Sequence, residues 1–262
     1  MNRKKVGLAL SGGGARGFAH VGVVKVLAEH NIPIDLITGT SAGSFVGGAL
    51  ACGLSADKIV EMAYKIGWLD IVRPGFSFKG LFSNAPLGRF LEANFPIRRF
   101  EDLKIPFAAI AYDLNKAETV IYTDSGDLPF AIRSSCTVPG VFVPLNDGNG
   151  RQLVDGGIVS SMPTEIARSM GAEIVIAVDL ISCGATFRAG RRSGFGIAIR
   201  SAMTLLRTAT QNQRALADIV IDPQIAHLRP DQIKRRDEFI RLGEEAARNS
   251  IDAIKEIVRT TQ

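Results

Sequence analysis

The sequence predicts an α/β fold with a mainly parallel central sheet that helices cover on both faces. Five short apolar runs have the length and composition of strands, and amphipathic stretches separate them along the chain. Runs this uniformly apolar are typical of parallel strands that are buried on both sides. The expected strands are Val6–Leu10, Asp35–Thr38, Phe107–Tyr112, Ile174–Leu180 and Ile219–Ile221.

The stretches between these strands predict the covering helices. The last of them carries an apolar stripe along one side, so we expect it to pack across the edge of the sheet. The expected helices are Phe18–Glu29, Ala42–Ala51, Asp57–Ile66, Thr164–Met170 and Asp237–Arg259. The segment Glu118–Thr123 is predicted to return as an antiparallel strand of a hairpin.

Two segments lack clear periodicity, and we predict that both are loops: Arg73–Leu87 and Gly184–Gly196. The first contains a group of large apolar residues, Phe76, Phe78, Leu81 and Phe82. These side chains form either a lid or acyl-chain wall over a site, or part of the core beside the preceding helix. The sequence leaves both interpretations open.

Size and composition predict one globular domain over residues 1–262. The 46% of hydrophobic residues can fill a substantial core, and a net charge of +5 permits contact with anionic surfaces without requiring nucleic acid. The three cysteines form neither a disulfide framework nor a metal-binding pattern, and no signal peptide is evident, so we expect a cytoplasmic location. The uncharged stretch 36–56 is long enough to cross a membrane, but glycines interrupt it, which favours a buried strand, turn and helix.

A first glycine cluster, GGGARG at residues 12–17, follows the first expected strand and precedes a helix. This pattern fits GxGxxG, but a dinucleotide site also needs a carboxylate at the carboxyl end of the second strand. Asp35 precedes that strand and therefore lies at its other end. The phosphate-binding loop GxxxxGK[ST] is not matched either. The sequence therefore favours a cradle for a reacting oxyanion over a nucleotide site.

A second cluster, GTSAG at residues 39–43, matches the GxSxG nucleophile elbow between a strand and a helix. A sharp turn there exposes the Ser41 hydroxyl, and the following helix directs N–H groups towards a developing anion. Adjacent parallel strands would deliver both clusters to the same edge of the sheet. The backbone donors of Gly12, Gly13 and Gly14 are then expected within reach of an oxyanion formed at Ser41.

A serine nucleophile needs a base, and two residues compete for this role. His227 would complete the chain order of an α/β-hydrolase triad, Ser41, Asp155 and His227. Asp155 instead ends an apolar run and precedes Gly156 and Gly157, so it can approach the turn of Ser41 closely. A lone carboxylate is a weak base and relies on burial and on the oxyanion hole.

Together with Ser134–Pro139, these motifs resemble the patatin-like phospholipases, most closely the bacterial branch similar to neuropathy target esterase. The resemblance implies a three-layer α/β/α hydrolase with a Ser41–Asp155 dyad, a Gly12–Gly14 oxyanion hole and neither metal nor cofactor. Cys136 departs from the small residues common in its block. The resemblance also implies supporting roles for Arg16, Gly17, Gly39, Gly43, Pro139, Gly156 and Gly157.

The implied reaction is hydrolysis of phospholipid or lysophospholipid esters through an acyl-serine, with peripheral contact at the inner membrane surface and no nucleic-acid partner. Two other classes remain open: a regulatory protein that binds a partner on the same fold, and acyl transfer to an acceptor other than water. The sequence does not indicate the oligomeric state.

Overall fold

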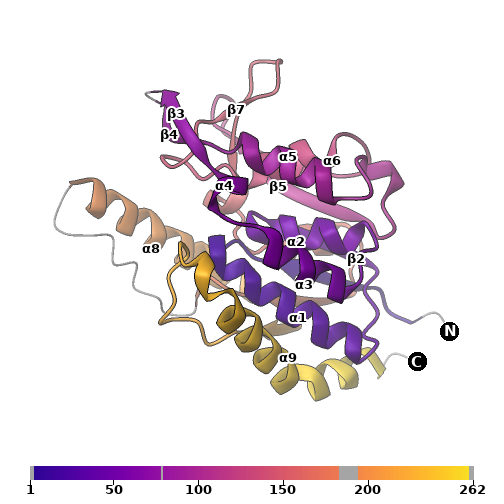
Figure 1. The fold of residues 1–262 in the computed structure, drawn as a ribbon. Helices are drawn as coiled ribbons and strands as arrows, with labels where there is room; N and C mark the ends of the chain where they lie inside the picture. Colours follow the sequence, from indigo (N-terminus) through magenta and orange to yellow (C-terminus); the bar gives the residue numbers. More distant parts are fainter. Residues whose placement is uncertain (1–2, 78, 183–193, 260–262) are drawn as a thin grey trace.

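The computed structural model describes residues 3–77, 79–182 and 194–259. Their centre is an eight-stranded sheet in the order β10-β9-β1-β2-β5-β8-β7, with β6 also paired to β5 (Figure 1). The five strands from β10 to β5 are parallel, whereas β6 and β8 run antiparallel to β5. The strands are β1 (Val6–Leu10), β2 (Leu36–Thr40), β5 (Phe107–Asp113), β6 (Glu118–Tyr122), β7 (Leu145–Asn146), β8 (Gln152–Asp155), β9 (Ile174–Val178) and β10 (Ile219–Ile221).

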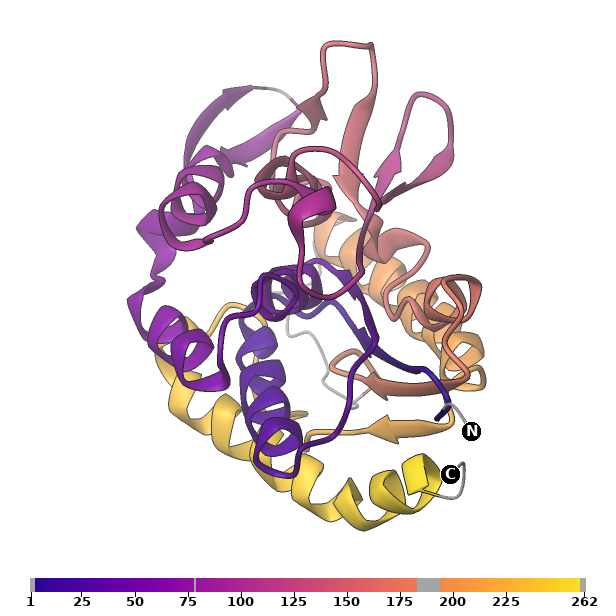
Figure 2. The same cartoon turned by 90° about the vertical axis from the view of Figure 1, so that its right-hand side faces the viewer.

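Helices cover both faces of this sheet (Figure 2). On β1, Val6, Leu8 and Leu10 pack into the larger core with α1, α2, α3 and α9, whereas Ala9 faces the smaller core beside α7. Helix α9 lies along α1 and contacts the edge strand β10, as its apolar stripe predicted. The helices named here are α1 (Phe18–Glu29), α2 (Ala42–Ala51), α3 (Ala56–Lys65), α7 (Thr164–Ser169), α8 (Gly194–Arg214) and α9 (Arg236–Arg259).

The observed strands and long helices confirm the predicted α/β class, and the elements that the sequence predicted begin and end within about two residues of the expected positions. The long helix α8 and the short strand β7 were not predicted. The uncharged stretch 36–56 forms the buried strand β2 and helix α2, and no helix in the described part of the chain is long and apolar enough to cross a membrane. Short 3-10 turns connect several elements: Gly14–Gly17, Phe100–Asp102, Gly156–Ile158 and Ile233–Arg235.

The prediction of a loop over Arg73–Leu87 is wrong. Residues Arg73–Ser77 and Gly80–Ser83 form the antiparallel hairpin β3–β4, which follows the short helix α4 (Trp68–Ile71) and precedes α5 (Ala85–Asn94). The hairpin is held from outside, because the N–H groups of Leu81 and Phe82 donate to the Val141 carbonyl. Such a distant partner leaves no periodicity in the local sequence.

Only Leu81 and Phe82 of the four expected lid residues have described side chains, and Leu81 is exposed while Phe82 is half-buried. Phe78 and the side chain of Phe76 lie outside the described residues. Most of the second predicted loop, Gly184–Gly196, also lies outside them, and its last residues begin α8.

Strand β5 pairs along one edge with two different strands, one after the other. Its first half pairs with β2, up to Thr40 opposite Ile110, and its second half pairs with β8, from Asp155 opposite Ala111. Strand β6 overlaps both pairings and therefore occupies the other edge. The carboxyl end of β2 and the end of β8 consequently meet at neighbouring positions on β5.

Candidate active site

Ser41 occupies a strained turn between β2 and α2. Its φ of 54° and ψ of −124° are unusual for a residue with a side chain and match the expected nucleophile elbow. Its N–H donates to Ser135 Oγ at 2.8 Å, and its carbonyl accepts from Ser44 Oγ at 2.6 Å. These contacts fix the turn, and the side chain keeps 7% of its surface exposed.

Glycine at the elbow permits a very close approach of the helix to the first strand. A Cβ on Gly43 would lie 2.1 Å from the Leu10 carbonyl oxygen, and one on Gly39 would lie 2.5 Å from the Gly43 carbonyl oxygen. Any larger residue would push α2 away from β1. Both glycines therefore support the position of Ser41, as the motif predicted.

Asp155 is the group that the fold brings to Ser41. Its N–H donates to the Thr137 carbonyl at 2.8 Å, and its Oδ1 accepts from the Gly157 N–H at 2.7 Å. Burial raises the pKa of Asp155 to about 6, and the hydrogen bonds from the Ser41 side chain and the Gly157 N–H oppose part of that rise. No lysine, arginine or histidine among the described residues forms an ion pair with this carboxyl group.

The first glycine turn lies directly beside the serine, since a Cβ on Gly12 would lie 3.3 Å from the Ser41 Cβ. The Gly12 N–H, however, donates to the Ser161 carbonyl at 2.9 Å and is not free to bind an oxyanion. Within the described part of the chain, no hydrogen bond engages the N–H groups of Gly13, Gly14 or Ala42. The expected set of donors is therefore corrected: Gly12 provides the close approach, and the other three residues carry the available donors.

Arg16 fixes the position of this glycine turn. Its buried guanidinium donates to the Leu228 carbonyl at 2.9 and 3.1 Å and to the Leu180 carbonyl at 3.1 Å. The Ala15 N–H donates to the Pro230 carbonyl at 2.8 Å. The segment after β10 thus holds the turn through its backbone.

The side chain of His227 in that same segment points elsewhere. Its Nε2 lies 2.9 Å from Glu238 on α9, and the ring is exposed. His20 is buried, and its Nε2–H donates to the Ser11 carbonyl at 2.7 Å. Burial lowers the pKa of His20 to about 4, so the ring is neutral near pH 7. Neither ring is brought to Asp155.

The remaining expected residues surround the two turns. Gly17 faces Ala42, and a Cβ there would lie 2.5 Å from the Ala42 Cβ. Gly156 and Gly157 begin the turn after Asp155, whereas Pro139 is exposed beyond the end of α6 (Leu128–Ser135). The Cys136 thiol lies 3.9 Å from Ser44 Oγ, and burial and the nearby Asp155 raise its pKa.

Sequence reasoning missed the individual roles of two serines. Ser135 Oγ accepts from the Ser41 N–H and donates to the Ile110 carbonyl at 2.5 Å, so it links the elbow to β5. Ser161 holds Gly12 through its carbonyl. Ser135 lies within the motif Ser134–Pro139, and that motif could have indicated the importance of Ser135. Ser161 acts through its backbone carbonyl, and such a role leaves no signal in the sequence. The described residues contain no cluster of three or more His, Cys, Asp or Glu arranged for a metal ion.

Comparisons with known proteins identify the family of the chain. A family model described as patatin-like phospholipase matches residues 8–168. Patatin-like phospholipase domain-containing protein 6 of Mus musculus is 36% identical over 187 residues, which are 67% of this chain and 13% of that protein. Lysophospholipase NTE1 of Yarrowia lipolytica is 34% identical over 189 residues, or 69% of this chain and 13% of that protein.

The solved structure of VipD from Legionella pneumophila has the same fold. It aligns with a TM-score of 0.56 and 14% identity, over 96% of this chain and 67% of VipD. The chain matches only about 13% of the length of the curated relatives quoted above. The family match and the identity to these relatives show that the chain belongs to the patatin-like phospholipase family of hydrolases, in the group related to neuropathy target esterase.

Proposed function

We propose that the chain is a serine acyl hydrolase that cleaves phospholipid or lysophospholipid esters through an acyl-serine intermediate. The observation that carries this proposal is the meeting of Ser41 with the buried, unpaired Asp155 beside free N–H groups of the glycine turn. The names of the relatives, a phospholipase domain protein and a lysophospholipase, support a lipid ester as the substrate class.

In the first half-reaction, Ser41 Oγ attacks the ester carbonyl while Asp155 accepts the hydroxyl proton. A buried carboxylate with a pKa near 6 is a stronger base than an ordinary aspartate, which suits this role near neutral pH. The N–H groups of Gly13, Gly14 and Ala42 stabilise the negative charge on the carbonyl oxygen. Collapse of the intermediate breaks the ester bond, and Asp155 returns the proton to the departing alcohol.

In the second half-reaction, water attacks the acyl-serine, and Asp155 accepts a proton from that water. The tetrahedral intermediate uses the same donors and releases a fatty acid and the free Ser41 hydroxyl. The partial positive charge at the start of α2 adds to the stabilisation of both anions. Each step uses only residues of this chain and water, and the enzyme is proposed to act from the cytoplasmic side at a membrane surface.

The test is labelling and hydrolysis with the whole chain. We expect a fluorophosphonate to label Ser41 stoichiometrically. We also expect the rate of ester cleavage to increase with acyl length when a chelator is present throughout. No labelling and no cleavage of any ester would instead favour a partner-binding protein on the same fold. Product analysis with alcohols as competing acceptors distinguishes hydrolysis from acyl transfer.

A further inference from the structure

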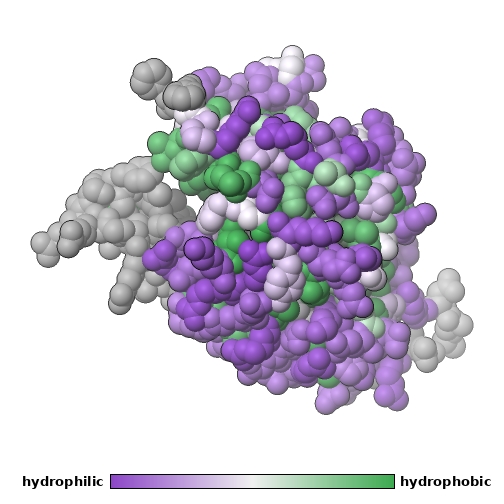
Figure 3. Space-filling view, in the orientation of Figure 1, coloured by the Kyte–Doolittle hydropathy of each residue, from purple (hydrophilic) through white to green (hydrophobic). Residues whose placement is uncertain are grey.

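Exposed apolar side chains gather on α4 and the β3–β4 hairpin. Leu69 is 87% exposed, Leu81 63% and Trp68 44%. Figure 3 shows hydrophobic surface over these elements, next to a mainly hydrophilic surface over α1 and α9. We refer to Trp68, Leu69 and Leu81 as the apolar face. Exposed apolar surface of this kind marks contact with a partner or a membrane.

This face is connected to the candidate active site through residues 137–143. The hairpin is bonded to residues 141–143, since the Val143 N–H donates to the Phe82 carbonyl at 2.9 Å. That segment follows Thr137, whose carbonyl accepts from the Asp155 N–H. In Figure 1, α4 and the hairpin lie on the side of the molecule away from both chain termini.

Basic residues border the apolar face. Lys65, Arg73 and Arg89 are exposed, and their side chains form neither an ion pair nor a hydrogen bond with any described residue. Half-buried Arg133 donates from Nε to Asn84 Oδ1 at 2.9 Å. Burial, and after it the charges of Arg73 and Arg89, lower the pKa of Arg133.

Few acidic groups offset this positive charge. Glu61 is an acidic neighbour of Lys65 and Glu92 is one of Arg133, and the Asp70 carboxylate accepts from the Gly67 N–H at 2.9 Å. Arg73 and Arg89 form no ion pair with a described carboxylate, so their charges remain available to an external anion.

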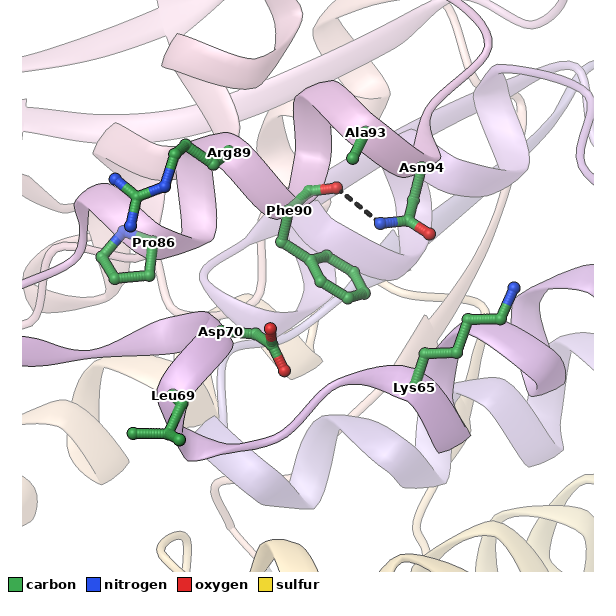
Figure 4. Close-up of a pocket in the computed structure, with 8 residues that line it drawn as sticks. All are labelled: Lys65, Leu69, Asp70, Pro86, Arg89, Phe90, Ala93 and Asn94. Carbon is green, nitrogen blue, oxygen red and sulfur yellow. Dashed lines mark hydrogen bonds between the residues drawn. The ribbon is translucent and has the colours of Figure 1, made fainter.

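A hollow of about 430 Å³ opens between α4 and α5 at the border of the apolar face. Figure 4 shows Phe90 and the Asp70 carboxylate near its centre, with Arg89 at one end and Lys65 at the other. Leu69 and Pro86 add apolar lining. The hollow thus combines apolar side chains with a cation at each end, and a phospholipid likewise combines acyl carbon with a negative head group.

We propose that the apolar face and its basic border dock onto a bilayer containing anionic phospholipid and so present the Ser41 site to its substrate. This inference rests on the proposed function and adds the surface and the lipid charge. Exposed Trp and Leu insert at the interface of a bilayer, and each nearby Lys or Arg adds electrostatic attraction to anionic lipid.

Trp68 provides a direct reporter, because it is the single tryptophan of the chain. The test uses the Ser41→Ala variant, which leaves the vesicles intact. Vesicles of phosphatidylcholine mixed with phosphatidylglycerol should shift the Trp68 emission to shorter wavelength, and should bind roughly tenfold more tightly than phosphatidylcholine alone. Unchanged emission at saturating lipid would overturn the proposal.

Paired variants separate the two components of the surface. Leu69→Asp with Leu81→Asp should weaken vesicle binding roughly tenfold or more while cleavage of a short soluble ester persists. A control is Leu216→Asp, at an exposed leucine before β10, and it should bind normally. Equal loss in both variants would contradict the proposed surface.

The charge component has its own matched pair. Arg73→Gln with Arg89→Gln should abolish the preference for anionic vesicles, whereas Lys4→Gln with Arg259→Gln makes the same change in charge near the chain termini and should retain it. Retained preference in the first pair would show that these arginines do not meet the lipid.

The remaining outcomes separate this inference from the proposed function. Cleavage of soluble esters without vesicle binding would refute the surface alone, and vesicle binding without cleavage of any ester would refute the function alone. A dimer in sedimentation that Leu69→Asp dissociates would assign the face to a second copy of the chain.

Discussion

The ends of β8 and β9 carry two buried aspartates in nearly the same local geometry but with different neighbours. Asp155 accepts from the N–H two residues later at 2.7 Å, and Asp179 does the same with the Ile181 N–H at 2.8 Å. Asp179 also pairs with Arg214 at 2.6 Å, whereas Asp155 meets the hydroxyl of Ser41.

Of these two buried carboxylates, only that of Asp179 is neutralised by a cation among the described residues. An unpaired buried charge costs stability, and its retention next to a nucleophile indicates a chemical use. Asp179 therefore has a structural role, connecting β9 to α8.

The largest expected effect is the loss of ester cleavage when the dyad is changed. Ser41→Ala and Asp155→Asn should each lower kcat/KM by about 10³-fold or more, because each removes a group that acts on the reacting atoms. His227→Ala should remain close to wild type, since its ring pairs with Glu238. A comparable loss in His227→Ala would favour the serine–histidine–aspartate triad.

Removing the cation that pairs with Asp179 should make the protein less stable. Arg214→Met leaves the fully buried Asp179 without a charged partner, and we expect a decrease in the free energy of unfolding of about 3 kcal/mol, measured by urea titration. Arg229→Met, which breaks the exposed pair with Asp231, serves as control and should leave stability unchanged. Similar midpoints for both variants would contradict a structural role for Asp179.

Removing the charge at Asp155 should instead increase the free energy of unfolding. Its pKa rises from 3.8 in the unfolded chain to about 6 in the folded one, so the folded state binds the proton more tightly and loses relative stability as the pH rises through this window. Asp155→Asn avoids that loss and should be more stable than wild type by up to about 3 kcal/mol at pH 8. The gain should vanish below pH 4; a gain independent of pH would have another cause.

The same titration should govern activity. If the ionised form of Asp155 is the base, kcat/KM for a soluble ester falls about tenfold per pH unit below pH 6 and is level above it. Unfolding must be monitored in parallel, because the fold holds His20 neutral and the protein therefore also loses stability as the pH falls from 6.5 towards 4. A profile that breaks near pH 7 and shifts in His227→Ala would contradict the assignment.

The smallest effect concerns backbone strain at Ser41. Glycine tolerates a φ of 54° without a penalty, so Ser41→Gly should be more stable than Ser41→Ala by about 1 kcal/mol, with both variants inactive. Equal stability would mean that the turn relaxes when the hydroxyl is removed.

The sequence was sufficient to predict the parts of the site that depend on local chain geometry. The apolar runs predicted the parallel strands, and the glycines around Ser41 predicted the elbow, because strand burial and turn strain both restrict which residues can occur. Asp35 was placed correctly at the amino end of β2, where it pairs with Arg3 at 2.5 Å.

What could not be predicted depends on contacts between distant segments. The donor state of Gly12 is decided by the Ser161 carbonyl, and the β3–β4 hairpin is held by residues 141–143. The antiparallel strand β8 is short, and its place on β5 follows only from the point where β2 ends. None of these pairings leaves a periodic pattern in the sequence.

The succession of β2 and β8 along one edge of β5 makes ester cleavage a sensitive indicator of strand alignment. Neighbouring positions on a strand face opposite sides of a sheet, so a slip of β8 by a single position would turn the Asp155 carboxyl away from Ser41 while preserving most of the core. Lengthened connections at residues 147–150 should therefore be tolerated, whereas an inserted residue within β8 should yield a protein that folds but does not cleave esters.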